Sequence, residues 1–162
     1  MRLLSVLGIS AAVGASVGGC SRDDALGPPE IRYGRDECAE CGMILADERF
    51  AAALLVRDGR AGAITPLVFD DIGDMLDFAQ AHPGETVVER YVHDAGSRDW
   101  VRATDAMYVR SESIHTPMGS GLAAYSDRAG AEERSRELRT GVLSFEEAAG
   151  WRRAWKEQRR KD

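Results

Sequence analysis

The stretch Leu67-Val68-Phe69-Asp70-Asp71 ends a run of apolar residues with an aromatic side chain and two acids. The same order of residue types returns in Ala123-Ala124-Tyr125-Ser126-Asp127, where an aromatic residue is again followed by two polar ones. Asp and Ser side chains accept hydrogen bonds from the first free N–H groups of a helix, so each stretch predicts the end of a strand and the start of a helix. A pattern that recurs in this way indicates two related structural units.

The residues around the first stretch predict a strand, a strand, a helix and a strand. Arg49 to Arg57 and Ala61 to Phe69 are apolar runs joined by Asp58-Gly59, which favours a hairpin turn. His82-Pro83-Gly84 ends the expected helix, and Thr86 to Val92 returns as a strand. The helix carries one apolar stripe, formed by Ile72, Met75, Leu76 and Ala79.

The residues around the second stretch predict the same order of elements. Strands are expected over 99–103, 107–109, 121–125 and 141–145, and a charged helix over 128–139. The predicted fold is therefore α+β, with two related ββαβ halves, residues 36–95 and 96–150, packed as one compact unit. Glu146 to Lys156 predicts a terminal helix, and residues 151–162 are assigned to a charged C-terminal tail.

The N-terminus has the features of an export signal. Met1-Arg2 supplies a positive charge, and Leu3 to Val17 is apolar and uncharged. These features predict a signal peptide over residues 1–19, which is too short to span a bilayer well. Val17-Gly18-Gly19-Cys20 resembles a bacterial lipobox, so Cys20 is expected to carry a lipid anchor. The alternative is an ordinary secretory signal in which Cys20 is incidental.

The residues that follow Cys20 bear on where the protein is held. Ser21 resembles the sorting signal for the outer membrane rather than the inner one. Residues 20–35 contain scattered charges with Gly and Pro and predict a flexible tether between the lipid and the domain. We therefore expect a protein that faces the periplasm and is attached to a membrane.

Composition excludes several classes of function. The formal net charge of −6 disfavours a nucleic-acid partner. Two cysteines remain if Cys20 is acylated, so the chain is not a disulfide-rich scaffold. No nucleophile, phosphate-loop or metalloprotease motif supports an enzyme. An acidic run is interpreted as helix capping and a solvated helix face rather than a calcium site; it consists of Asp70, Asp71, Asp74 and Asp77.

Sulfur side chains are concentrated between Cys38 and Met43. Soft sulfur ligands favour Cu(I), because polarisable donors bind this polarisable cation best. In an extended segment, Cys41 and Met43 would point the same way, so both sulfur atoms could bind one ion. Met118 is expected as a further ligand, because it stands in a loop rich in Gly and Pro where a thioether has no evident packing role. Cys38 and His115 are secondary candidates.

Two interpretations of the cysteine pair remain open on these grounds. A copper site would use Cys41 together with methionine sulfur, whereas an exported thiol-disulfide redox module would use Cys38 and Cys41 as a dithiol. Zinc is disfavoured, because it prefers four Cys or His ligands and a second such pair is missing. The oligomeric state is not indicated by any pattern in the sequence.

Several segments resemble the NosL family in order and spacing. They are Cys41-Gly42-Met43, Asp47-x-Arg49-Phe50, Phe69-Asp70-Asp71-Ile72-Gly73, Tyr91-Val92, Trp100-x-x-Ala103, Ala106-x-Tyr108-Val109 and Pro117-Met118-Gly119-x-Gly121-Leu122-Ala123. The resemblance covers residues 36–145 and the lipobox. It implies two ββαβ halves and a lipid-anchored copper chaperone that carries Cu(I) on Cys41, Met43 and Met118. The implied task is assembly of the copper-sulfur centre of nitrous oxide reductase, and the implied partner is that reductase or its membrane-bound maturation complex.

Overall fold

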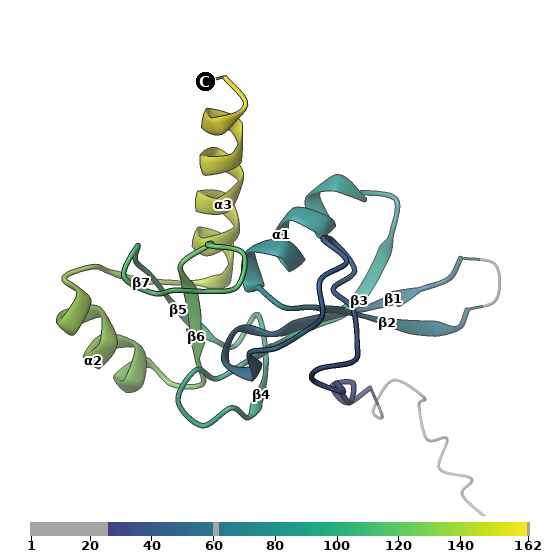
Figure 1. Cartoon of the computed structure of the whole chain (residues 1–162), viewed down its shortest axis with the longest axis horizontal. Helices are drawn as coiled ribbons and strands as arrows, with labels where there is room; N and C mark the ends of the chain where they lie inside the picture. Colours follow the sequence, from purple (N-terminus) through teal and green to yellow (C-terminus); the bar gives the residue numbers. More distant parts are fainter. Residues whose placement is uncertain (1–25, 60–61, 162) are drawn as a thin grey trace, which may run out of the picture.

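The computed structural model describes residues 26–59 and 62–161. The predicted signal peptide and Cys20 lie outside the described residues. Two antiparallel sheets and three α-helices make up the fold (Figure 1). None of the described helices combines the length and apolar character that crossing a membrane requires.

The first half of the fold is a four-stranded sheet with one helix packed on it. Its strands lie in the order β2-β1-β3-β4, and every neighbouring pair is antiparallel. The bounds are β1 Ala52–Arg57, β2 Ile64–Phe69, α1 Ile72–Ala81, β3 Thr86–His93 and β4 Trp100–Arg102. A 3-10 turn, η2 Glu48–Phe50, precedes β1.

The second half repeats this arrangement in a three-stranded sheet of order β6-β5-β7. The bounds are β5 Met107–Arg110, β6 Leu122–Tyr125, α2 Arg128–Leu138 and β7 Val142–Leu143. In both halves the first strand lies between the second and third strands of the unit, and the helix follows the second strand. The predicted α+β fold with two related ββαβ halves is therefore confirmed. The strand expected at 99–103 was assigned to the second half, but it forms β4 and pairs with β3 of the first sheet. A parallel bridge between Asp94 and Ala124 connects the two sheets.

The two stretches that predicted the repeat begin the two helices as expected. The Asp71 side chain accepts a hydrogen bond from the Gly73 N–H at the start of α1, and Asp127 accepts one from Gly130 at the start of α2. Each such cap stabilises its helix by about 1 kcal/mol. The helix starts thus follow from local sequence.

Strand β1 is the centre of the main core because it is covered on both faces. Leu54 lies in the cluster with Phe69 and Met75 on the α1 side, whereas Leu55 lies with Tyr91 on the other side. Leu54 is fully buried, and burial of a side chain of this size contributes about 1.5–3 kcal/mol.

The C-terminal helix differs from the prediction. Helix α3 extends over Phe145–Arg159 and begins with a capping box between Ser144 and Glu147. Residues 151–159 are therefore helix rather than a charged tail. Within them, Arg152 is buried and pairs with Asp77 of α1 at 2.9 Å. Figure 1 shows α3 rising beside α1, with the C-terminus at its far end.

The predicted tether of residues 20–35 also needs correction over its described part. Ile31 and Tyr33 pack against the main core, and the Tyr33 hydroxyl lies 3.1 Å from the His93 ring. The Tyr91 hydroxyl donates a hydrogen bond to the Leu26 carbonyl. Leu26, Ile31 and Tyr33 thus contact the domain, because their apolar side chains find partners in two of its hydrophobic clusters.

Candidate metal centre

The two cysteines lie in a tight turn rather than in an extended segment. The Cys38 N–H donates to the Met43 carbonyl at 2.8 Å, and the Gly42 N–H donates to the Cys38 carbonyl at 2.8 Å. Gly42 has a φ of 72°, a left-handed conformation that favours glycine. The segment from Cys41 to Met43 is therefore not the extended strand that was expected, since the chain turns at Gly42.

The turn places both thiols against the start of α1. The Ala39 N–H donates to the Val68 carbonyl at 2.8 Å, which fixes the turn on the end of β2. The Cys38 thiol lies 3.5 Å from Asp74 Oδ2, and the Cys41 thiol lies 3.8 Å from Asp70 Oδ1. One donor atom from each of these four residues lies within 4.8 Å of the other three. Sulfur and carboxylate donors from two distant segments thus converge on one point.

Asp70 and Asp74 belong to the cluster although neither is among the predicted site residues. The acidic run is predicted to cap a helix and form a solvated helix face, but all four carboxyl groups are buried; their exposed fractions are 2% for Asp70, 0% for Asp71, 4% for Asp74 and 4% for Asp77. Only the capping assignment holds, at Asp71. The spacing of Asp70, Asp74 and Asp77 follows one face of a helix, and this periodicity is the signal that could have identified an inward-facing acidic stripe.

Burial makes charge costly at all four groups. It raises the pKa of Cys41 to about 12 and that of Asp74 to about 6, and it also raises the pKa values of Cys38 and Asp70. The carboxyl groups also repel one another, which adds to the shifts of Asp70 and Asp74. Without a cation the cluster therefore retains protons that water-exposed acids would release.

Backbone N–H groups partly oppose this effect at the sulfur atoms. Those of Glu40, Cys41 and Asp70 favour the Cys38 thiolate, and that of Met43 favours the Cys41 thiolate. Such donors stabilise negative charge on sulfur in metal-thiolate sites as well. The turn is thus arranged to hold thiolates once a cation replaces their protons.

Three large apolar side chains are exposed in the described part of the chain, and two of them belong to the cysteine turn. Met43 is 53% exposed and Ile44 is 45% exposed. The third, Met118, is 37% exposed and belongs to the loop of residues 116–121. Thioethers at the surface are accessible to a metal ion or to a second protein.

Asp71 connects the Met118 loop to the same helix start. Its Oδ2 atom accepts hydrogen bonds from the Thr116 hydroxyl at 2.6 Å, the Met118 N–H at 3.0 Å and the Ser120 N–H at 3.4 Å. Asp71 directly follows Asp70, the partner of Cys41. The Met118 loop belongs to the second half of the fold. Its backbone is nevertheless fixed by hydrogen bonds to Asp71, the residue next to Asp70 of the cluster.

The histidines lie apart from the cluster. His115 is exposed, and it is not a member of the metal-competent group found among the described residues. His93 is buried, with Nδ1 2.6 Å from the Arg98 carbonyl and its ring against Trp100. His82 stacks on Phe78 at the end of α1. The latter two have structural environments.

The fold and the cluster together define a small α+β protein with Cys and Asp side chains gathered at the start of α1. A family model described as NosL matches residues 31–149. The chain belongs to the NosL family, as its sequence motifs predict.

One solved structure resembles the whole domain. It is the crystal structure of the copper chaperone NosL from Shewanella denitrificans, with 22% identity and a TM-score of 0.59. The match covers 74% of this chain and 96% of that chain. At this identity the match establishes a shared fold. No match is found among curated protein sequences.

Proposed function

We propose that this protein is a lipid-anchored, periplasm-facing copper chaperone that carries Cu(I) to the assembly of the copper-sulfur centre of nitrous oxide reductase. The observation that carries this proposal is the convergence of Cys38, Cys41, Asp70 and Asp74 within 4.8 Å in a chain of the NosL family. A protein of the same fold is described as a copper chaperone. Copper is the cargo of this activity, and the protein is not an enzyme.

The donor atoms fit a soft monovalent cation. Two thiols lie in one turn, and thiolate is the protein ligand that Cu(I) prefers. We assign Cys41 and Cys38 as the inner donors, with the exposed sulfur atoms of Met43 and Met118 on the solvent side. His115 is not required by this arrangement.

The carboxyl groups have a separate role in this proposal. Cu(I) binding displaces the thiol protons, and Asp70 and Asp74 already accept hydrogen bonds from the two thiols. They can receive these protons and limit the accumulation of negative charge around a monovalent ion. A site of two thiolates and a +1 ion has a net charge of −1, so further ionised carboxylates would repel it.

Release requires a second set of ligands to approach before the first set leaves. The Met43 and Met118 side chains are exposed, and in this proposal they form the accessible side of the site. An acceptor can therefore add its own donors stepwise. The proposed acceptor is nitrous oxide reductase or its membrane-bound maturation complex. The lipid on Cys20 attaches the chaperone to a membrane, which we propose is the outer membrane rather than the inner membrane.

A metal competition experiment tests the copper assignment. The reduced protein is expected to take one Cu(I) from a chromogenic chelator and to prefer it to Zn(II). Met118→Leu should weaken Cu(I) binding, whereas Met107→Leu, a change in β5, should leave it unaltered. Tight Zn(II) binding with feeble Cu(I) binding would contradict the proposal. Equal affinities in the two methionine variants would remove Met118 from the ligand set.

A redox module is the second candidate, and the closeness of the two thiols favours it. The electrostatics oppose it, because burial raises both thiol pKa values, whereas a catalytic dithiol needs a lowered pKa at its attacking sulfur. For a dithiol, Cys38→Ser and Cys41→Ser should abolish activity equally. Equal loss together with measurable disulfide reductase activity would favour the redox module over the chaperone.

A further inference from the structure

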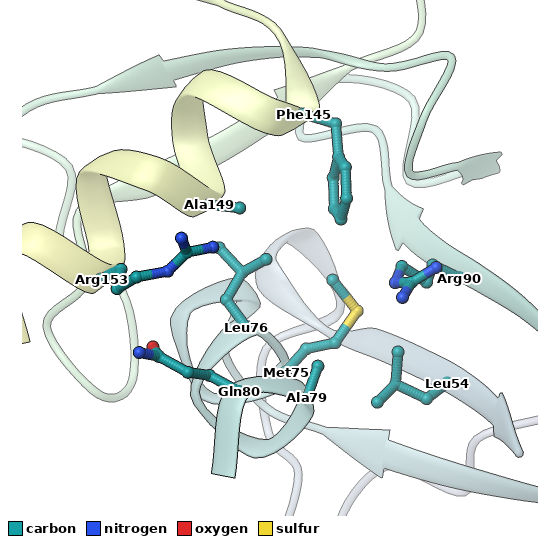
Figure 2. Close-up of a pocket in the computed structure, with 9 residues that line it drawn as sticks. All are labelled: Leu54, Met75, Leu76, Ala79, Gln80, Arg90, Phe145, Ala149 and Arg153. Atoms are coloured by element: carbon teal, nitrogen blue, oxygen red, sulfur yellow. The ribbon is translucent and has the colours of Figure 1, made fainter. Parts of the chain in front are cut away.

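A cavity of about 270 Å³ lies between α1, α3 and the inner face of the first sheet, away from the cysteine turn (Figure 2). Its walls are apolar except for two arginines and a glutamine, and no acidic residue lines it. The lining residues are Leu54, Met75, Leu76, Ala79, Gln80, Arg90, Phe145, Ala149 and Arg153.

Arg90 occupies a strand position at which an apolar residue is expected. It pairs directly with Leu54 across β3 and β1, so the two side chains share the sheet face that α1 covers. Leu54 is fully buried, and Arg90 is partly buried beside it. A charge at such a position loses part of its hydration, which is unfavourable unless an anion compensates.

No such anion is found among the described residues. Within the described part of the chain, no carboxylate oxygen lies within 4.0 Å of the side-chain nitrogens of Arg90 or Arg153. The Arg90 guanidinium is placed over the Phe145 ring at 5.8 Å, an interaction that does not neutralise charge.

The two cations stand on opposite sides of the cavity. Figure 2 shows Arg153 on the α3 side near Gln80 and Arg90 on the strand side, with Leu76, Met75 and Ala79 between them. An adjoining cavity shares Gln80 and Arg153, and both cations and acids line the rest of it: Lys156, Arg160, Asp77 and Glu157. Lys156 is paired with Asp77 at 2.7 Å, so the cations that face the first cavity are Arg90 and Arg153.

We propose that this cavity binds a small molecule with a carboxylate at each end of an unbranched apolar chain. One carboxylate pairs with Arg90 and the other with Arg153, and the chain lies against Met75, Leu76 and Ala149. Guanidinium groups suit carboxylates because they can donate two parallel hydrogen bonds. The apolar walls between them select a chain that carries no polar group in its middle. This site is independent of the copper assignment.

The test uses calorimetry and methyl NMR on the purified protein with a length series of straight-chain dicarboxylates: succinate, adipate, suberate and sebacate. Affinity is expected to rise about threefold to fourfold per added methylene while the chain buries new surface. It should fall once the chain exceeds the distance between the two arginines. The methyl signals of Met75 and Ala149 should shift with saturation.

Arg90→Gln and Arg153→Gln are each expected to weaken dicarboxylate binding at least tenfold without lowering the thermal midpoint. Arg128→Gln, which removes an exposed cation paired with Glu132, is the matched control and should bind like the parent. Octanoate should bind at least tenfold more weakly than suberate. Three outcomes would overturn the proposal: no saturable shift at Met75, equal affinity for octanoate and suberate, or equal binding by the three variants.

Discussion

At the scale of single residues, the site depends on acids placed where their charge is unfavourable. Asp74 is almost fully buried beside a thiol and two other carboxyl groups. Its pKa rises from an ordinary value of 3.8 to about 6 because of burial. The folded state therefore binds its proton more tightly than the unfolded state does between these pH values. The contribution of Asp74 to the free energy of unfolding therefore falls as pH rises through this window.

Asp74→Asn should remove that pH dependence. In the metal-free, reduced protein, the variant is expected to gain free energy of unfolding over the parent as pH rises from about 4 to about 6, with the full gain above that window. Chemical denaturation at several pH values measures it. Asp94→Asn is the opposite case, because its carboxylate accepts backbone N–H groups and has a lowered pKa. That change should be more destabilising at neutral than at acidic pH. A constant offset for Asp74→Asn across pH would contradict the assignment.

The residues that carry sulfur stand out in the sequence, whereas those that carry oxygen show only the helical spacing of three acids. Cys38, Cys41, Met43 and Met118 stand out because soft donors are few and clustered, and the assignment of the ligand set stays a prediction. Asp70 and Asp74 are common residue types whose burial depends on a turn that comes earlier in the chain. The backbone reversal at Gly42 was also missed, since the alternation expected of a strand was assumed across it.

At the scale of elements, the start of α1 organises two loops from different halves of the fold. Asp70 and Asp74 face the cysteine turn, whereas Asp71 caps the helix and binds the Met118 loop. The equivalent cap in the second half, Asp127, binds only its own helix in the described hydrogen bonds. The two halves can therefore be compared directly. Asp127 caps a helix, whereas Asp71 caps a helix and also binds a loop.

Asp71→Ala should be considerably more destabilising than Asp127→Ala. Each change removes a cap that contributes about 1 kcal/mol. Asp71→Ala also leaves buried loop donors without an acceptor, which costs roughly 1–3 kcal/mol for each group. Equilibrium unfolding gives the two losses, and hydrogen exchange at the Met118 and Ser120 amides should accelerate only in Asp71→Ala. Equal losses with unchanged exchange would show that Asp71 acts as a cap alone.

The order of the elements was predictable because turns, caps and periodicity are local. Asp58-Gly59, Asp71 and Asp127 place the hairpin and both helix starts close to their observed positions. The role of the last helix was not predictable, because it rests on a contact between distant segments. Arg152 is buried opposite Asp77 of α1, and Lys156 reaches the same carboxylate at 2.7 Å.

At the scale of the whole molecule, the two halves have different tasks. The first half supplies the thiols and carboxyl groups, and the second half supplies the loop that carries Met118. Helix α3 contacts α1 of the first half and strands β5 and β7 of the second. If Met118 is a copper ligand as proposed, a single ββαβ unit would not contain all of the sulfur donors.

The proposed anchor is separable from the folded domain, and a localisation experiment tests this. Cys20→Ala should release the protein from the membrane fraction while leaving its copper affinity unchanged, because Cys20 is not among the proposed copper ligands. Mass spectrometry of the mature N-terminus should find an acylated Cys20 in the parent. An unmodified mature terminus at another residue would remove the anchor from the proposal.

The exposed thioethers of Met43 and Met118 also make the protein vulnerable to oxidative damage. Both sulfur atoms belong to side chains that are exposed to solvent. Peroxide has the same access, and it converts a thioether into a sulfoxide that is polar and no longer offers a soft lone pair of the same kind. Buried Cys38, with its raised pKa, is better protected because thiols oxidise through the thiolate. Oxidative stress would therefore disable the solvent side of the site first, and methionine sulfoxide reductases could restore it.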